Sequence, residues 1–253
     1  MSDPAALAFV LDAPLQSWGV DSRYQQRDTA AFPTKSGLIG LLAAALGIDK
    51  HAPDESTRLA PYAALRLIAV RAALDQVRPG GRLSDFHTIG GGYDKKVPWQ
   101  KISIPRKASK GFPPADFPVI TRRTYLTGTT FIAILAGERA VLATAAAALE
   151  DPVWGLWLGR KACLPASPLA PTLESTAQLA FDALRLKFKC PAAPLESFDR
   201  QEEPNQDDHS PGVFHQPDQP ENFGERSHAS RPVRYLRAVR PDHSAANTMF
   251  DSI

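Results

Sequence analysis

The 253-residue chain lacks several features that mark particular protein classes. Its two cysteines, Cys163 and Cys190, are too few for a disulfide framework or a cysteine-rich zinc site. No apolar run reaches the ~18 residues that a membrane-spanning helix needs, and the longest, 38–48, is interrupted by glycines. The first six residues carry neither a basic nor a signal-type apolar region. We therefore expect a cytoplasmic protein that is neither secreted nor bound to a membrane.

Signatures of catalysis are also missing. The six histidines form no i, i+4 pair of the kind that binds zinc on a helix, and no Gly-x-Ser-x-Gly elbow is present. Segment 31–40 (AFPTKSGLIG) lacks the first glycine of an ATP-binding phosphate loop. We expect no cofactor, no metal and no catalytic residue, so that the chain is not an enzyme, with endoribonuclease activity left open.

What the chain does have is an uneven charge distribution, although its formal net charge is only +2. Segment 82–125 carries nine lysines and arginines against three acids, and segment 226–240 carries five arginines and no acid. Segment 196–225 carries nine acids and one arginine. Two basic blocks are typical of a face that binds a polyanion, while solvated charged loops would give the same pattern.

Hydrophobic periodicity predicts a mixture of strands and helices. Helices are expected at 36–46, where Ser36 is a suitable N-cap, and at 138–150. Strands are expected at 5–12, 64–74, 125–136, 179–189 and 231–239. The order strand, helix, strand, strand, helix, strand is that of the ferredoxin-like plan, an α+β fold also used by a common RNA-binding module.

The remaining segments complete the expected domain organisation. We expect a single domain over 1–253. Segment 82–124 has no clean periodicity and is predicted to be a long basic excursion, a class of loop that is usually functional or disordered. Segment 190–225 is predicted to be an acidic loop or hairpin, and 241–253 a tail.

Several residues have chemistry suited to an RNA ligand. Lys35 and Ser36 stand at a predicted helix N-terminus, where they could hold a phosphate or simply cap the helix and face solvent. Arg160 and Lys161 follow a glycine in a turn, which suits a phosphate but also an ordinary surface turn. Trp18 could stack on a base or lie in the core.

Six segments occur in an order that resembles one known family. These segments are PLQSWG (14–19), FPTKSGLIGLLAAALGI (32–48), DFHT (85–88), YLTGTTFIAIL (125–135), WLGRKACLP (157–165) and SHASRPV (227–233). In this order they resemble the CasD subunit family of type I-E CRISPR Cascade complexes, a branch of the RAMP superfamily. The resemblance covers nearly the whole chain.

This resemblance implies a ferredoxin-like RAMP domain with a protruding basic thumb hairpin inside 82–124 and extra C-terminal strands. It implies a non-catalytic subunit that caps the 5′ handle of the CRISPR RNA and helps to position the guide for target DNA. The implied protein partners are the CasC backbone subunits and the large CasA subunit. The RNA-contact candidates carried over from matching segments, or drawn from the basic blocks, are Gln16, Trp18, Arg27, Thr34, Lys35, Ser36, His87, Lys101, Arg106, Lys107, Arg122, Arg123, Arg160, Lys161, Arg226, Ser230 and Arg231.

Two alternatives remain at this point. In the type I-C relative, the related protein is itself the endonuclease that processes precursor RNA, using a tyrosine, a lysine and an adjacent histidine. Here His87 would be the acid/base candidate, with Tyr24 or Lys35 assisting. The second alternative is a scaffold that contacts only proteins.

Overall fold

One antiparallel sheet forms the centre of the computed structural model, which describes residues 3–20, 25–72, 81–89, 119–188, 193–205, 207–208 and 210–238. In sheet order its strands are β10 (Val213–Asn222), β11 (Ser227–Leu236), β9 (Arg200–Glu202), β4 (Arg66–Ala72), β7 (Thr130–Glu138), β1 (Pro4–Leu11) and β8 (Thr172–Glu174). The predicted strands at 5–12, 64–74 and 231–239 correspond to β1, β4 and β11, and the fold is a mixture of helix and sheet, as expected.

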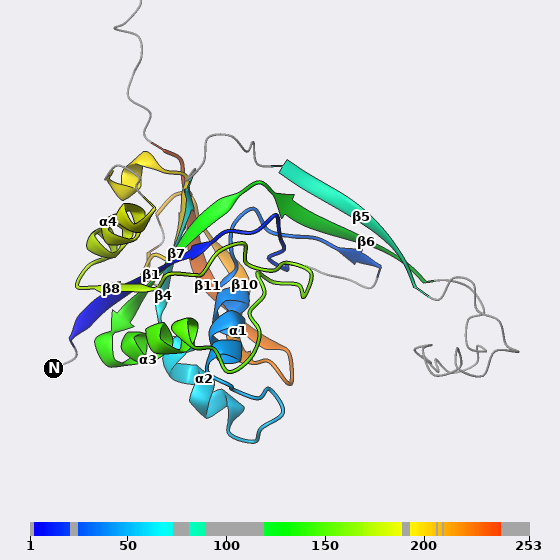
Figure 1. Ribbon diagram of the computed structural model, residues 1–253, viewed down its shortest axis with the longest axis horizontal. Coiled ribbons are helices and arrows are strands. Elements are labelled where there is room, and N and C mark those ends of the chain that lie inside the picture. The colour runs from blue at the N-terminus through cyan, green and yellow to red at the C-terminus, as the bar shows by residue number, and fades with distance from the viewer. Residues whose placement is uncertain are drawn as a thin grey trace, which may run out of the picture.

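Helices cover both faces of this sheet (Figure 1). Leu7, Phe9 and Leu11 of β1 pack with α1 (Lys35–Ala45), α2 (Glu55–Ala63) and α3 (Arg139–Glu150). The alternate residues of β1, among them Ala8 and Val10, pack with α4 (Ala177–Lys187) on the other face. Because both faces of β1 are covered, its sequence is a continuous apolar run rather than an alternating one.

The first helix starts one residue earlier than expected, and its cap is different. Thr34 has extended backbone geometry, and its hydroxyl accepts a hydrogen bond from the Gly37 N–H. The expectation that Ser36 caps α1 is therefore wrong, because Ser36 already lies in the first turn. Buried leucines fix the helix against the sheet, and the chain leaves it at Gly47, whose φ of 65° suits glycine.

Two further expectations about strands are wrong. Segment 125–136 is not one strand, since Gly128 with φ 59° separates β6 (Val119–Thr127) from β7. Segment 179–189 is helix α4, because Thr176 accepts from the Leu179 N–H and starts a helix there. The buried residues of α4, such as Ala180 and Leu184, recur at helical spacing. Helix α2 was not expected, since Pro61 and few apolar residues obscure its periodicity.

A second, smaller sheet extends from the body as an arm (Figure 1). Strand β6 pairs along its whole length with β5 (Gly81–Ile89), and its C-terminal end pairs with β2 (Leu15–Gln16). It also pairs in parallel with β3 (Gln26–Arg27). The basic segment 82–124 thus contributes β5 and most of β6, while its middle, 90–118, lies outside the described residues, as does the predicted tail 241–253.

The acidic segment is not only a loop. After the short 3₁₀ helix η2 (Leu195–Ser197), the chain adds β9 and then the β10–β11 hairpin to the edge of the main sheet. Two of its acids are buried partners of cations: Lys35 Nζ lies 2.9 Å from Glu203, and Arg231 Nε lies 2.6 Å from Asp218. We call these four residues the buried charge cluster. Two of the nine acids of segment 196–225 therefore pair with cations inside the fold.

Within the described part of the chain, the structure contains no helix of the length and apolar character needed to cross a membrane.

The buried charge cluster leads to a prediction about stability. Replacing only Lys35 by Met leaves the Glu203 carboxylate without its closest cation, and breaking a buried pair from one side typically costs about 3–5 kcal/mol. The double variant Lys35→Met with Glu203→Leu removes both charges and is expected to lose much less. The free energy of unfolding in urea measures both losses.

Arg139 and Asp3 provide a matched control, because they form an exposed pair at 2.6 Å. Arg139→Met is expected to cost at most about 1 kcal/mol, as exposed pairs do. If the single and double variants of the buried pair were equally unstable, the argument from an uncompensated charge would fail.

Candidate nucleic-acid interface

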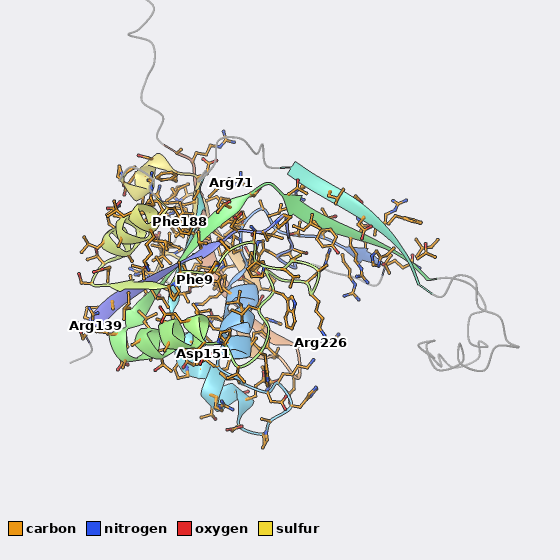
Figure 2. All side chains as sticks on the ribbon, in the orientation of Figure 1. Phe9, Arg71, Arg139, Asp151, Phe188 and Arg226 are labelled. Carbon is orange, nitrogen blue, oxygen red and sulfur yellow. The ribbon has the colours of Figure 1, made fainter. Side chains whose placement is uncertain are left out.

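Two adjoining cavities lie at the N-terminal end of α1. The larger has a volume of about 800 Å³ and the smaller about 300 Å³, and both are lined by Gly19, Ser36 and His228. We call the pair the α1 groove. Its walls come from the loops after β1 and β3, from β5, from the turn after Leu158 and from the β10–β11 hairpin. Arg226 lies at the turn of this hairpin, on the surface (Figure 2).

The groove is electropositive. Four arginines from separate segments line it: Arg27, Arg82, Arg160 and Arg226. Among the described residues that line the groove, Asp218 is the only acid, and both of its carboxylate oxygens bind the Arg231 guanidinium, at 2.6 and 3.0 Å. Because Asp218 is already paired, the groove keeps its excess of positive charge, which favours an anionic ligand.

Arg160 is held in place by the chain around it. Its guanidinium donates to the carbonyl oxygens of Thr124 (3.0 Å) and Arg27 (2.7 Å) and lies 4.8 Å from the centre of the Tyr125 ring. The turn before it depends on Gly159, whose φ of 97° is in the left-handed region. A Cβ atom on Gly159 would lie only 1.6 Å from the carbonyl oxygen of Ser17. Glycine at 159 is therefore a requirement of this turn.

Two of the predicted base-contact residues are buried and bonded internally. The Gln16 amide donates to the carbonyl oxygens of Leu11 (2.9 Å) and Thr129 (2.6 Å), and its oxygen accepts from the Trp18 indole N–H at 3.2 Å. The Trp18 ring is completely buried, against Gly37 of α1. These contacts give Gln16 and Trp18 a structural role in holding the loop after β1.

Two of the predicted phosphate-contact residues are also buried. Lys35 and Arg231 belong to the buried charge cluster, where their charges face Glu203 and Asp218. Burial lowers the pKa of Lys35, and the neighbouring Glu203 carboxylate partly offsets that effect. The backbone N–H of Lys35 donates to Asp218 at 2.7 Å, so an internal anion already lies at the start of α1.

The structure places the other predicted residues in three different settings. Arg27, Thr34, Ser36, Arg160 and Arg226 line the α1 groove. His87, Arg122 and Arg123 lie on the arm, where the exposed His87 ring lies 3.1 Å from the Asp85 carboxylate. The remaining candidates are Lys161, exposed and 5.7 Å from the Trp157 ring; Ser230, exposed on β11; and Lys101, Arg106 and Lys107, which lie outside the described residues.

Some groove residues were not predicted. Arg82 was counted in a basic block but not chosen, and His228 lies in the matching segment 227–233. Phe223 and Ser17 had no signal beyond their positions in or beside matching segments. Tyr235 also lines the larger cavity. Burial raises the pKa of its hydroxyl, which favours the neutral form, so Tyr235 adds no negative charge to the groove.

The groove has groups that suit the binding of an anionic ligand. The described residues contain no group of three His, Cys, Asp or Glu side chains placed to hold a metal ion. Cys163 is fully buried, and burial raises the pKa of its thiol, which disfavours the reactive thiolate. The arginines and aromatic rings of the groove are groups of the kind that hold phosphates and bases.

Comparisons with known proteins agree with one another. A family model described as "CRISPR-associated protein (Cas_Cas5)" matches residues 6–235. The CRISPR system Cascade subunit CasD of Escherichia coli (strain K12) is 31% identical over 166 residues, which are 63% of this chain and 66% of that protein. The match thus spans just under two thirds of the length of that relative.

Two solved structures are similar over most of the chain. A chain of a "CRISPR RNA-guided surveillance complex" is 28% identical, with a TM-score of 0.65, over 92% of this chain and 90% of that one. A structure described as "Crystal structure of Cas protein" is 30% identical, with a TM-score of 0.57, over 93% of this chain and 100% of that one.

The contact between Gly159 and Ser17 leads to a second prediction. Gly159→Ala is expected to destabilise the protein strongly, since the new methyl group would overlap the Ser17 carbonyl and displace the loop that lines the groove. Gly212→Ala is the matched control: its φ is 90°, but nothing lies within 4 Å of the added Cβ. The control is expected to lose only the ~1–2 kcal/mol of a left-handed residue. Urea unfolding of both variants checks this, and equal losses would contradict it.

Proposed function

Since the chain belongs to the Cas5 family of CRISPR-associated proteins, we propose that it binds and caps the 5′ handle of the CRISPR RNA in a type I-E surveillance complex. In this role it is a non-catalytic subunit that helps to position the guide for target DNA. The similarity to a Cascade subunit and to a chain of an RNA-guided surveillance complex supports this assignment.

The observation that carries the proposal is the α1 groove. Arginines at positions 27, 82, 160 and 226 are distant in sequence but line two adjoining cavities. An RNA handle is single-stranded, so its phosphates can follow such a groove while its bases turn towards side chains. The binding of several phosphates would make the affinity depend strongly on salt.

The fold offers a second argument. Four neighbouring strands of the main sheet lie in the order β4-β7-β1-β8. Along the chain, with α2 and the arm strands left out, the elements follow one another as β1-α1-β4-β7-α3-β8. We interpret this order as the ferredoxin-like RAMP arrangement, extended by β9, β10 and β11, and the arm of β5 and β6 as the base of the thumb in 82–124. On these grounds we keep two proposals made from the sequence: a single domain over 1–253 and a thumb within 82–124.

The arm also has the surface of a binding element. Phe86 and Ile120 are 58% and 42% exposed, and with Arg122 they line a further cavity of about 540 Å³. Exposed apolar side chains beside an arginine suit contact with RNA or with a neighbouring subunit. The CasC backbone subunits and the large CasA subunit are the protein partners in this proposal, and target DNA is reached through the assembled complex.

Precursor cleavage is the less favoured alternative. In this alternative His87 is the acid/base group, and Lys35 or Tyr24 assists it. Lys35 is buried and bound to Glu203, and Tyr24 lies outside the described residues. The chain also has an adjacent lysine and histidine at Lys50 and His51, the pair that the type I-C relative uses. Both are exposed after α1, and neither lines the groove.

The groove arginines provide a test of RNA binding. The assembly is purified through the full-length chain, its RNA is sequenced, and RNA of that sequence is bound again across a salt series. Arg27→Gln and Arg226→Gln are each expected to weaken binding and to reduce the slope of log affinity against log salt by about 0.7, one phosphate contact on a single strand.

Arg58→Gln, on the exposed face of α2, changes the net charge equally and is the matched control. Its slope is expected to equal that of the wild type. An assembly free of RNA, or equal slopes for the groove variants and the control, would refute the proposed function.

Precursor RNA incubated with the purified chain in a chelator tests the alternative. No specific product is expected, because Lys35 is bound to Glu203 and neither Lys50 nor His51 lines the groove. A specific product that His87→Ala or His51→Ala abolishes would establish the nuclease instead.

A further inference from the structure

The hydroxyl group of Ser17 is buried at the smaller cavity of the α1 groove and has no partner in the protein. Ser17 is only 2% exposed, it lines this cavity, and its Oγ atom makes no hydrogen bond. A buried hydroxyl without a partner is unfavourable, and in native structures it usually has an explanation in function or in a bound group. We propose that Ser17 reads the base of one unpaired nucleotide of the bound RNA.

The backbone around Ser17 is fixed from both sides. Its N–H donates to the Leu158 carbonyl at 3.1 Å, and its own carbonyl lies so close to Gly159 that no side chain fits there. Its neighbours Gln16 and Trp18 use their polar side-chain atoms within the protein. In this buried run of three residues, the Ser17 hydroxyl is the side-chain polar group without a partner in the protein, and the backbone that carries it is fixed before a ligand arrives.

The cavity around Ser17 has the other groups that a nucleotide needs. The rings of Phe223 and His228 line it and meet edge to face, with centroids 6.2 Å apart, so they offer an aromatic surface to a base. Arg27 and Arg160 supply positive charge for the adjoining phosphates. Its volume of about 300 Å³ is at the small end of the range for ligand sites, which suits one nucleotide rather than a longer segment.

The division of labour between these groups leads to base selection. Phosphate contacts by arginines are the same for every nucleotide, so they give affinity without sequence preference. The Ser17 hydroxyl can donate or accept, so it selects a base by place: a base with a polar edge atom within its reach satisfies it, and a base without one leaves it unsatisfied. This inference rests on the proposed function, because it requires that RNA occupies the groove.

The experiment uses the full-length chain and the RNA recovered from its assembly. That RNA is sequenced and resynthesised as a set in which one base at a time is replaced along the 5′ segment. The affinities of the wild type, Ser17→Ala and Ser17→Cys are measured for every member of the set. Ser17→Cys replaces the hydroxyl by a somewhat larger thiol, which is a much weaker donor, and it serves if the alanine variant does not fold.

Ser167→Ala is the matched control. The Ser167 hydroxyl is also buried without a partner, but it lines a separate cavity formed mainly by proline and leucine residues beyond α3. Its removal is expected to leave RNA affinity and base preference unchanged. The unfolding midpoint of each RNA-free variant is recorded in parallel.

We expect the wild type to prefer one base at a single position of the 5′ segment. Ser17→Ala is expected to bind the natural RNA about three- to tenfold more weakly, the range of one neutral hydrogen bond, and to lose the preference at that position alone. Its unfolding midpoint without RNA should not fall, because an unpartnered hydroxyl has been removed.

Different outcomes separate this inference from the proposed function. An assembly without RNA would overturn both. RNA binding with an unchanged base preference in Ser17→Ala, or an equal loss for all sequences, would overturn the inference alone. A loss that follows removal of a ribose 2′-hydroxyl rather than a change of base would also overturn it, since Ser17 would then contact the sugar.

Discussion

The buried charge cluster is the constraint on which the rest of the structure depends. It joins the start of α1, through Lys35, to Glu203 and Asp218, which follow 168 and 183 positions later in the chain, and to Arg231 of β11. Charges buried this deeply persist only if each is matched and hydrogen-bonded. Ion pairs therefore hold the C-terminal hairpin against α1, while the pairing of β9, β10 and β11 attaches the hairpin to the main sheet.

The α1 groove exists because of this attachment. One wall is the hairpin, which the cluster fixes, and the opposite wall is the turn at Gly159 and Arg160, which hydrogen bonds tie to β3 and β6. Asp218 bonds the first N–H of α1, so the cluster uses the helix terminus while the surface arginines keep their charge. In the proposed function, stability and RNA binding thus depend on different cations: Lys35 and Arg231 stabilise the fold, and the groove arginines bind the RNA.

The sequence predicted most of the sheet and the helices α1 and α3, because their apolar patterns are long and their boundaries carry clear signals. The prediction failed for α4, whose eleven residues mix apolar and polar side chains in a pattern that fits either a strand or a helix. The Thr176 cap is the signal that favours the helix. For the site, the sequence proposed Arg27, Arg160 and Arg226 as RNA contacts; the structure places all three in the α1 groove, and their contact with RNA stays a prediction. The sequence could not separate them from Lys35 and Arg231, because burial and ion pairing with the acidic segment are tertiary properties. Ser17 escaped notice for the same reason, since an unsatisfied hydroxyl is visible only in three dimensions.

The two outer strands of the main sheet restrict how another protein can attach to it. Strand β10, at one edge, contains Pro217 and Pro220, which have no N–H to offer a neighbouring strand, and β8, at the other edge, has only three residues. Such edges resist β-augmentation, the addition of a foreign strand by main-chain hydrogen bonding. A subunit that docks on this body must therefore recognise side chains, loops or the projecting arm, a mode of recognition that also protects the free protein from edge-to-edge aggregation.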